Sequence, residues 1–342
     1  MRPLSHAVAV LALVAGCHKH AKGPSPEITG LAAIPASAEA IVVIDVARVV
    51  DSPLVSRAID MLVARDPALA SNWQKLHDSC KLDVKNVDHV TLAIGPHVAP
   101  NGPNGQPGTG PVLLVATGHL VENDLASCVR TMVGQGGGSL TAKPAGSHTL
   151  YEAKDGNRVM YFAFGRADTV LMSASEAFVT EALGDGKKVT DNAEMSKWIG
   201  MADQKAPIWA AGRADERVKQ HMVTIVNGQI SAGPTAYMAS FDPTSGAKLE
   251  LDAIMANPAD AKALESFAKA QLGALGMVAQ AKSLGTIVDK IAIAADGAVL
   301  HLKATLDQDE VNQLISALDA KGSASQDTPP AGSGSGAGSQ GK

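Results

Sequence analysis

The sequence has very few aromatic residues: phenylalanine, tryptophan and tyrosine make up 3% of its 342 residues. Alanine, valine, leucine and isoleucine must therefore fill its core, and an apolar share of 46% is enough for a sizeable one. The chain also has no run of basic residues, and its formal net charge is −5. A mildly acidic chain of this kind argues against nucleic acid as a partner.

Several patterns that mark catalytic or cofactor sites are missing as well. The glycines of 102–110 are not followed by Gly-Lys-Ser/Thr, and those of 134–138 come after a helix instead of opening one. Ser173 lacks the flanking glycines of a nucleophile elbow and has capping-box spacing to Glu176. Asp45 is the best isolated carboxylate, but it has the place of a turn cap. We therefore expect no catalytic residues, no cofactor and no enzyme.

Metal-binding patterns are incomplete. The ten histidines are scattered, and no two of them are four residues apart. His301 falls on the polar face of an expected strand, where a solvated surface position is the ordinary role. His77 and Cys80 form only half of a zinc site, because no matching second pair follows at ligand spacing. The sequence therefore predicts no metal site.

The N-terminus has the parts of an export signal. Ala7–Ala15 is an apolar run too short to cross a bilayer as a helix, which takes about 20 residues, but it suits the core of a signal peptide. Arg2 is the only charged side chain before Lys19. The run ends in Val14-Ala15-Gly16-Cys17, which resembles the lipobox of bacterial lipoproteins. The resemblance implies cleavage before Cys17, diacylation of its thiol and acylation of the new amino terminus.

Acylated Cys17 would attach the protein to membrane lipid, its first expected partner. Each buried methylene contributes about 0.8 kcal/mol, so two or three acyl chains hold firmly where one does not. The alternative is an ordinary secreted protein with a chance cysteine. His18 stands where many enterobacterial lipoproteins carry the aspartate of inner-membrane retention, so the resemblance favours the outer membrane.

The two remaining cysteines are expected to pair. Export would place Cys80 and Cys128 in an oxidising compartment. A bond between them would close a loop of about 48 residues and contribute roughly 4 kcal/mol in the chain-entropy model. Two buried free thiols are the main alternative. Cys128 is expected to point inward, because one face of a helix over 121–132 is formed by Val121, Leu125, Cys128, Val129 and Met132.

The periodicity predicts an α+β fold of two similar units, each a mainly antiparallel sheet packed with amphipathic helices. The order strand, helix, helix, strand, strand, helix occurs twice, at about 40–133 and 248–319. A tandem duplication and two independent α+β runs both explain this order. Helix starts are expected at Ser52-Pro53, Asn257-Pro258 and Asp307, and hairpin turns at Asp155-Gly156 and Asp296-Gly297. Strands at 147–153, 157–163, 168–173, 207–213 and 235–241 would join or bridge the two sheets.

Composition divides the chain into five parts. The expected parts are a lipoprotein signal peptide (1–16), a tether (17–30), a first α+β unit (31–200), a second α+β unit (201–320) and a disordered Gly/Ser-rich tail (321–342). Within the first unit, residues 96–110 are expected to form a mobile hairpin loop.

The N-terminal part of the chain resembles a group of exported lipoproteins of unknown function from Gram-negative bacteria. The resemblance rests on the lipobox, the tether, Ile34–Val46 and Ser52-Pro53-Leu54. It implies a location and a repeated α+β body, with no catalytic residues to carry over. We therefore expect a lipid-anchored, non-catalytic interaction or scaffold module with an envelope protein of unknown identity as partner. The alternative is a binder of a small molecule or envelope polymer in a cleft between the two units. An enzyme whose site is assembled from distant residues comes third.

Overall fold

The computed structural model describes residues 28–65, 83–96, 110–280 and 285–324. Its strands are β1 (Ala40–Asp45), β2 (Val87–Ile94), β3 (Val112–Gly118), β4 (Ser139–Ala145), β5 (His148–Asp155), β6 (Arg158–Arg166), β7 (Thr169–Ser173), β8 (Ile208–Arg213), β9 (Ala236–Asp242), β10 (Ala247–Ile254), β11 (Ile291–Asp296) and β12 (Val299–Leu306). Its α-helices are α1 (Val46–Val49), α2 (Pro53–Arg65), α4 (Glu122–Gln135), α5 (Glu176–Leu183), α6 (Ala193–Met201), α7 (Glu216–Ile225), α8 (Pro258–Gln280), α9 (Gly285–Asp289) and α10 (Gln308–Ala324). Short 3-10 helices are η1 (Gly30–Ala33), η2 (Val84–Asn86) and η3 (Val189–Asp191).

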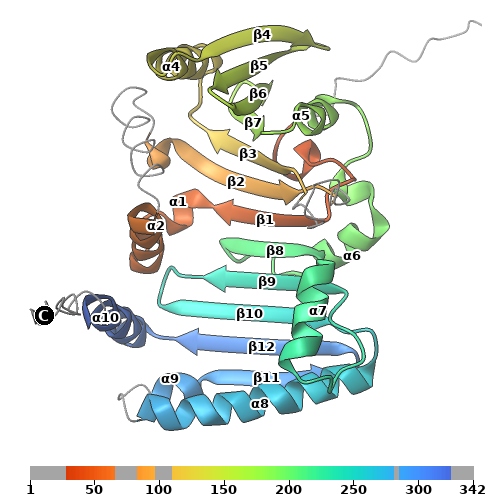
Figure 1. The fold of residues 1–342 in the computed structure, drawn as a ribbon, viewed down its shortest axis with the longest axis vertical. Coiled ribbons are helices and arrows are strands. Elements are labelled where there is room, and N and C mark those ends of the chain that lie inside the picture. The colour runs from red at the N-terminus through yellow and green to blue at the C-terminus, as the bar shows by residue number, and fades with distance from the viewer. Residues whose placement is uncertain (1–27, 66–82, 97–109, 281–284, 325–342) are drawn as a thin grey trace, which may run out of the picture.

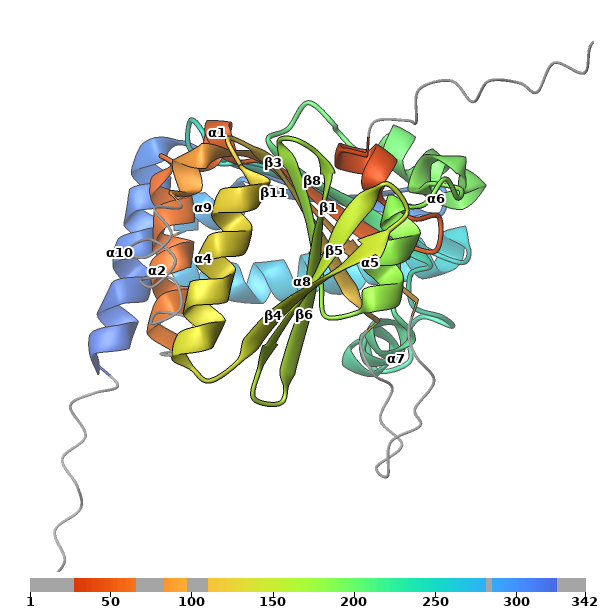
Figure 2. The same cartoon turned by 90° about the horizontal axis from the view of Figure 1, so that it is seen from above.

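The described strands form one 12-stranded antiparallel sheet in the order β11-β12-β10-β9-β8-β1-β2-β3-β7-β6-β5-β4 (Figure 1). In both views α2, α4 and α10 lie toward one end of the strands, and α5, α6 and α7 lie toward the other (Figure 2). The α+β class, with a mainly antiparallel sheet packed with helices, is confirmed. Within the described ranges, no helix combines the length and the apolar composition needed to cross a membrane.

The twofold order of elements is present, but the strand pairing of the two runs differs. The first run is β1, α1, α2, β2, β3, α4, and the second is β10, α8, α9, β11, β12, α10. In the first run, the strand that follows the helices, β2, pairs with β1. In the second run, the last strand, β12, pairs with β10 and leaves β11 at the sheet edge. The two runs therefore share an element order but not a strand pairing.

The two units share one sheet and the largest buried cluster. Strand β8 of the second unit pairs with β1 of the first, with Ala211 opposite Ile41. The largest buried cluster joins Ile41 and Leu171 of the first unit to Trp209 and Met238 of the second. Helices α5 and α6 pack on this cluster through Phe178, Val179, Met195 and Trp198. The largest cluster therefore crosses the boundary expected at residue 200, whereas a further cluster around Leu264 and Ile293 belongs to the second unit alone.

Two serines near expected helix starts, Ser173 and Ser52, use their hydroxyl groups for contacts other than helix capping. Ser173 still belongs to β7, so the chain leaves the sheet later, and Ser175 caps α5 by accepting the Phe178 N–H at 3.3 Å. The Ser173 hydroxyl oxygen instead accepts the Ser175 N–H at 3.0 Å. Ser52 precedes α2 as expected, but its buried hydroxyl donates to the Pro243 carbonyl oxygen at 3.0 Å. Ser52 thus connects the first unit to the turn between β9 and β10.

The end of the tether and the start of the tail lie at other residues in the structure than the sequence predicted. Ile28 is buried in the largest cluster and packs so closely on Gly165 that a Cβ there would lie 2.6 Å from it. The expected tether therefore ends before Ile28. Helix α10 continues to Ala324, so residues 321–324 are helical and do not belong to the tail. The signal peptide, residues 17–27, most of 96–110 and residues 325–342 lie outside the described residues.

Candidate functional site

Cys128 is the one predicted site residue that the structure describes. It lies half-buried on α4, is disulfide-bonded, and its Sγ is 3.8 Å from Sδ of Met132. Its partner is not among the described residues, so the pairing with Cys80 stays a prediction, as does lipidation of Cys17. Val121, expected on the same buried face, is 56% exposed because it precedes the first turn of the helix.

Two polar residues singled out in the sequence have structural partners. Asp45 caps α1 by accepting the Arg48 N–H at 3.2 Å, as expected for a turn cap. The His301 side chain is partly exposed, and its Nδ1 lies 2.6 Å from Oδ1 of Asp252, directly opposite on β10. Among the described residues, no group of three or more His, Cys, Asp or Glu side chains is placed to hold a metal ion.

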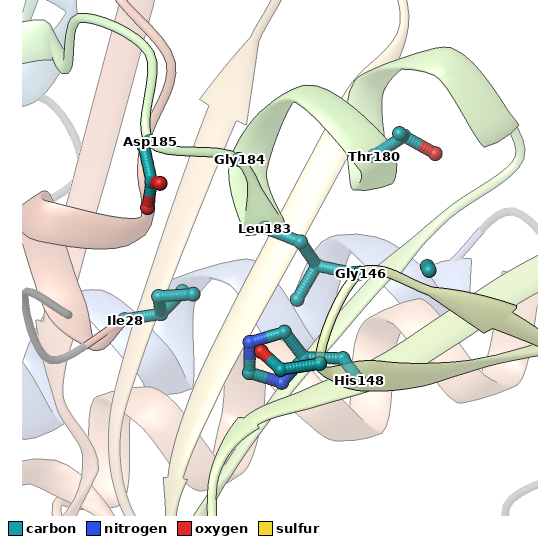
Figure 3. Close-up of a pocket in the computed structure, with 9 residues that line it drawn as sticks. Ile28, Gly146, His148, Thr180, Leu183, Gly184 and Asp185 are labelled. Carbon is teal, nitrogen blue, oxygen red and sulfur yellow. The ribbon is translucent and has the colours of Figure 1, made fainter.

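A pocket of about 290 Å³ lies between the β4–β5 turn and the end of α5 (Figure 3). Nδ1 of His148 is 2.9 Å from the Phe164 carbonyl oxygen. Because a carbonyl only accepts, Nδ1 is the donor in this contact. In Figure 3 the Leu183 side chain reaches toward His148, while Asp185 lies on the other side of the pocket, near Ile28. The pocket thus places one imidazole beside apolar side chains and does not bring its polar groups together.

A second hollow, the junction groove, lies where the two units meet. It has two adjoining lobes, of about 220 and 430 Å³, which share Glu194, Trp198 and Arg213. The smaller lobe is further lined by residues 36–39 and Asn192, and the larger one by Lys197, Lys219, Thr235 and Ile254. Its size is in the range of small-molecule sites.

Backbone contacts between the units hold the groove in shape. At the β1–β8 pairing, a Cβ on Gly212 would lie 2.5 Å from the Cβ of Ala40, so only glycine permits this approach. The next residue, Arg213, donates its backbone N–H to the Glu39 carbonyl oxygen at 2.8 Å. Asn192 caps α6 and also donates to the Ala36 carbonyl oxygen at 3.1 Å. The groove therefore belongs to the rigid seam of the sheet.

The charged side chains of the groove come from separate elements. Arg213 ends β8, Lys219 lies on α7, and Lys197 lies on α6. Arg213 donates through Nη2 to Glu194, and both side chains are exposed, which makes this a weak ion pair. Lys219 is 3.2 Å from Glu216, and Lys197 makes no hydrogen bond or ion pair with any described residue. Only weak ion pairs within the described structure thus offset the charge of Arg213 and Lys219.

Asp260, at the start of α8, is a buried polar group that the fold does use. Its carboxylate accepts the Ser231 hydroxyl at 2.6 Å, the Ser231 N–H at 2.7 Å and the Asn257 side-chain amide at 2.9 Å. The Ser231 hydroxyl contributes most to holding the pKa of Asp260 below its usual range. The cluster attaches the loop after α7 to the first turn of α8.

We expect Asp260→Ala to lower the free energy of unfolding by about 2 kcal/mol near neutral pH, because buried N–H and O–H donors lose their acceptor. The folded pKa is lower than the unfolded value, so the contribution is complete above about pH 4 and fades as the pH falls through the folded pKa. Urea denaturation at neutral and at acid pH measures both effects. Asp309→Ala, at an exposed acid in the first turn of α10, is the matched control. Equal losses in the two variants would contradict the role of Asp260.

Comparisons with known proteins do not identify the chain. No family model and no curated protein matches it. Two chains of solved structures match, one of them titled "Structure of crystal form I of TP0453". That chain is 10% identical, with a TM-score of 0.44, and the match covers 84% of this chain and 97% of the other. The likeness is too weak to carry an inference about function.

Proposed function

We propose that this protein is a lipid-anchored, non-catalytic interaction module of the cell envelope, and that it binds its partner or ligand in the junction groove. One observation supports the proposal most. Charged side chains from both units converge on a rigid groove, and the fold uses little of their charge. By contrast, Ser52, Asp260 and His301 all have partners within the fold.

Two of the carboxylates with lowered pKa belong to local ion pairs. Hydrogen bonds from Lys262 and Lys269 lower the pKa of Glu265 to about 2, and all three side chains lie on α8. The Arg166 guanidinium lowers the pKa of Asp168 across the turn between β6 and β7. Each pair belongs to neighbouring positions of one local segment. These shifts therefore indicate local ion pairs, and the groups lie outside the junction groove.

The lipid anchor is tested by replacing the cysteine. We expect Cys17→Ser to abolish incorporation of labelled palmitate and to release the protein from the membrane fraction, because the acyl chains supply the attachment. His18→Ala, at the next position, is the control and should keep both the label and the membrane association. If Cys17→Ser remains with the membranes and is not released, the anchor is not at Cys17.

The binding role is tested in native envelopes. Crosslinking with a tag on residues 325–342 captures whatever the protein holds, and Lys197→Glu/Arg213→Glu should lose that species. Arg158→Glu, an exposed arginine at the start of β6, reverses charge outside the groove and should retain it. Equal crosslinking by both variants would overturn the junction groove as the binding site.

A further inference from the structure

The junction groove carries opposite charge in its two lobes. The larger lobe has three cationic side chains, Lys197, Arg213 and Lys219, and one acid, Glu194. The smaller lobe has two acids, Glu39 and Glu194, and only Arg213 as a cation. Since the lobes share Glu194, Trp198 and Arg213, a ligand that spans both meets an excess of positive charge at one end and of negative charge at the other.

The cationic end can accept an anion without breaking the fold. The Lys197 ammonium makes no hydrogen bond or ion pair with the described residues. Arg213 engages Glu194 through Nη2, and the rest of its guanidinium donors are not engaged within the described structure. The Lys219–Glu216 pair is mostly exposed at Glu216 and therefore weak. A carboxylate or phosphate at this end can accept hydrogen bonds from the Lys197 and Arg213 donors that have no acceptor among the described residues.

The wall between the two ends is apolar and belongs to the core. Trp198 is 8% exposed and Met195 is 2% exposed, and both are members of the largest buried cluster. Ile254 lines the larger lobe and packs against the same cluster. Because close-packed core side chains hold their positions, this wall presents a fixed apolar surface to the middle of a ligand.

We infer that the junction groove binds a short zwitterionic ligand. Its carboxylate or phosphate lies among Lys197, Arg213 and Lys219, its ammonium group lies at Glu39 and Glu194, and an apolar middle lies on Trp198. The inference rests on the proposed function, because it names the ligand chemistry of the same site. A short peptide with free ends has this chemistry, and so does a phosphoethanolamine headgroup.

Isothermal titration of the full-length protein in detergent micelles tests the ligand class. The probes are trialanine, N-acetyl-trialanine, trialanine amide and glycerophosphoethanolamine. We expect one of the two zwitterionic probes to bind. Binding of trialanine identifies a carboxylate as the anion of the ligand, and binding of glycerophosphoethanolamine identifies a phosphate. If trialanine binds, blocking either of its ends should weaken binding by about tenfold, because each end loses one charged contact. Equal binding of free and blocked trialanine would overturn the inference.

Variants locate the binding. Lys197→Ala and Lys219→Ala should each weaken binding of the zwitterionic probe several-fold, and Lys197→Ala removes a side chain on which the fold does not depend. Arg158→Ala is the control and should bind normally. No binding of any probe, with crosslinking still lost in Lys197→Glu/Arg213→Glu, overturns the ligand class and leaves the proposed site standing. No probe binding together with intact crosslinking in that variant overturns both.

Discussion

Ile41→Ala is expected to lower the free energy of unfolding by about 4 kcal/mol and to loosen both units together. Ile41 is 1% exposed and lies on β1, between β2 of the first unit and β8 of the second. Truncating a buried isoleucine removes apolar contacts and leaves a cavity, which costs about 2–5 kcal/mol. A large value is expected here because the cluster around Ile41 takes side chains from both units.

Urea denaturation combined with hydrogen exchange distinguishes a shared core from two separate ones. A shared core predicts one transition, with equal loss of protection in β3 and β10. Ile94→Ala is the matched control, because Ile94 is 36% exposed at the end of β2 and its loss should cost well under half as much. Loss of protection confined to β1–β7 would show that the second unit folds independently and would contradict the shared core.

Cys128→Ser is expected to lower the free energy of unfolding by about 4 kcal/mol in non-reducing buffer. The disulfide at Cys128 restricts the unfolded chain, and if its partner is Cys80 the closed loop has about 48 residues. Helix α4 carries Cys128 and packs on β4 and β5 at one end of the sheet. The variant should therefore raise hydrogen exchange most in α4.

The pairing itself is tested with a double variant. Cys80→Ser should cost as much as Cys128→Ser, and combining the two should cost nothing further, because either change breaks the same bond. In reducing buffer the wild type should approach the stability of the variants. Full stability of Cys80→Ser would show that Cys128 has another partner. If both cysteines are found as free thiols in non-reduced protein, the disulfide bond does not exist.

The sequence by itself determined where three of the helices begin and where the chain turns at Asp296-Gly297. Helices α2, α8 and α10 start after Ser52, at Asn257-Pro258 and after Asp307, as predicted. The Asp307 N–H donates to the Glu310 carboxylate at 3.0 Å, and the Glu310 N–H donates to the Asp307 carboxylate at 3.0 Å. At the Asp296-Gly297 turn, the glycine has the positive φ that such hairpins need. These signals are readable because each depends on residues within about four positions of one another.

The lipid-anchor prediction also comes from the sequence alone, for a different reason. Lipobox processing depends on a linear motif, so the prediction made from Val14-Ala15-Gly16-Cys17 does not depend on the tertiary fold. The described residues begin after this segment and leave the prediction as it stood.

Only the tertiary structure decided which strands became neighbours and which side chains met. Alternation along a strand tells which residues share a face, but it does not tell which strand lies alongside, because many pairings bury the same face. Thus nothing local indicated that β12 would lie beside β10, or that β8 would join β1. Glu39, Lys197 and Arg213 line the junction groove for the same reason: the β1–β8 pairing and the packing of α6 bring distant segments together. The junction groove is a product of those long-range contacts, which is why the sequence offered a cleft between the units only as an alternative and without naming its residues.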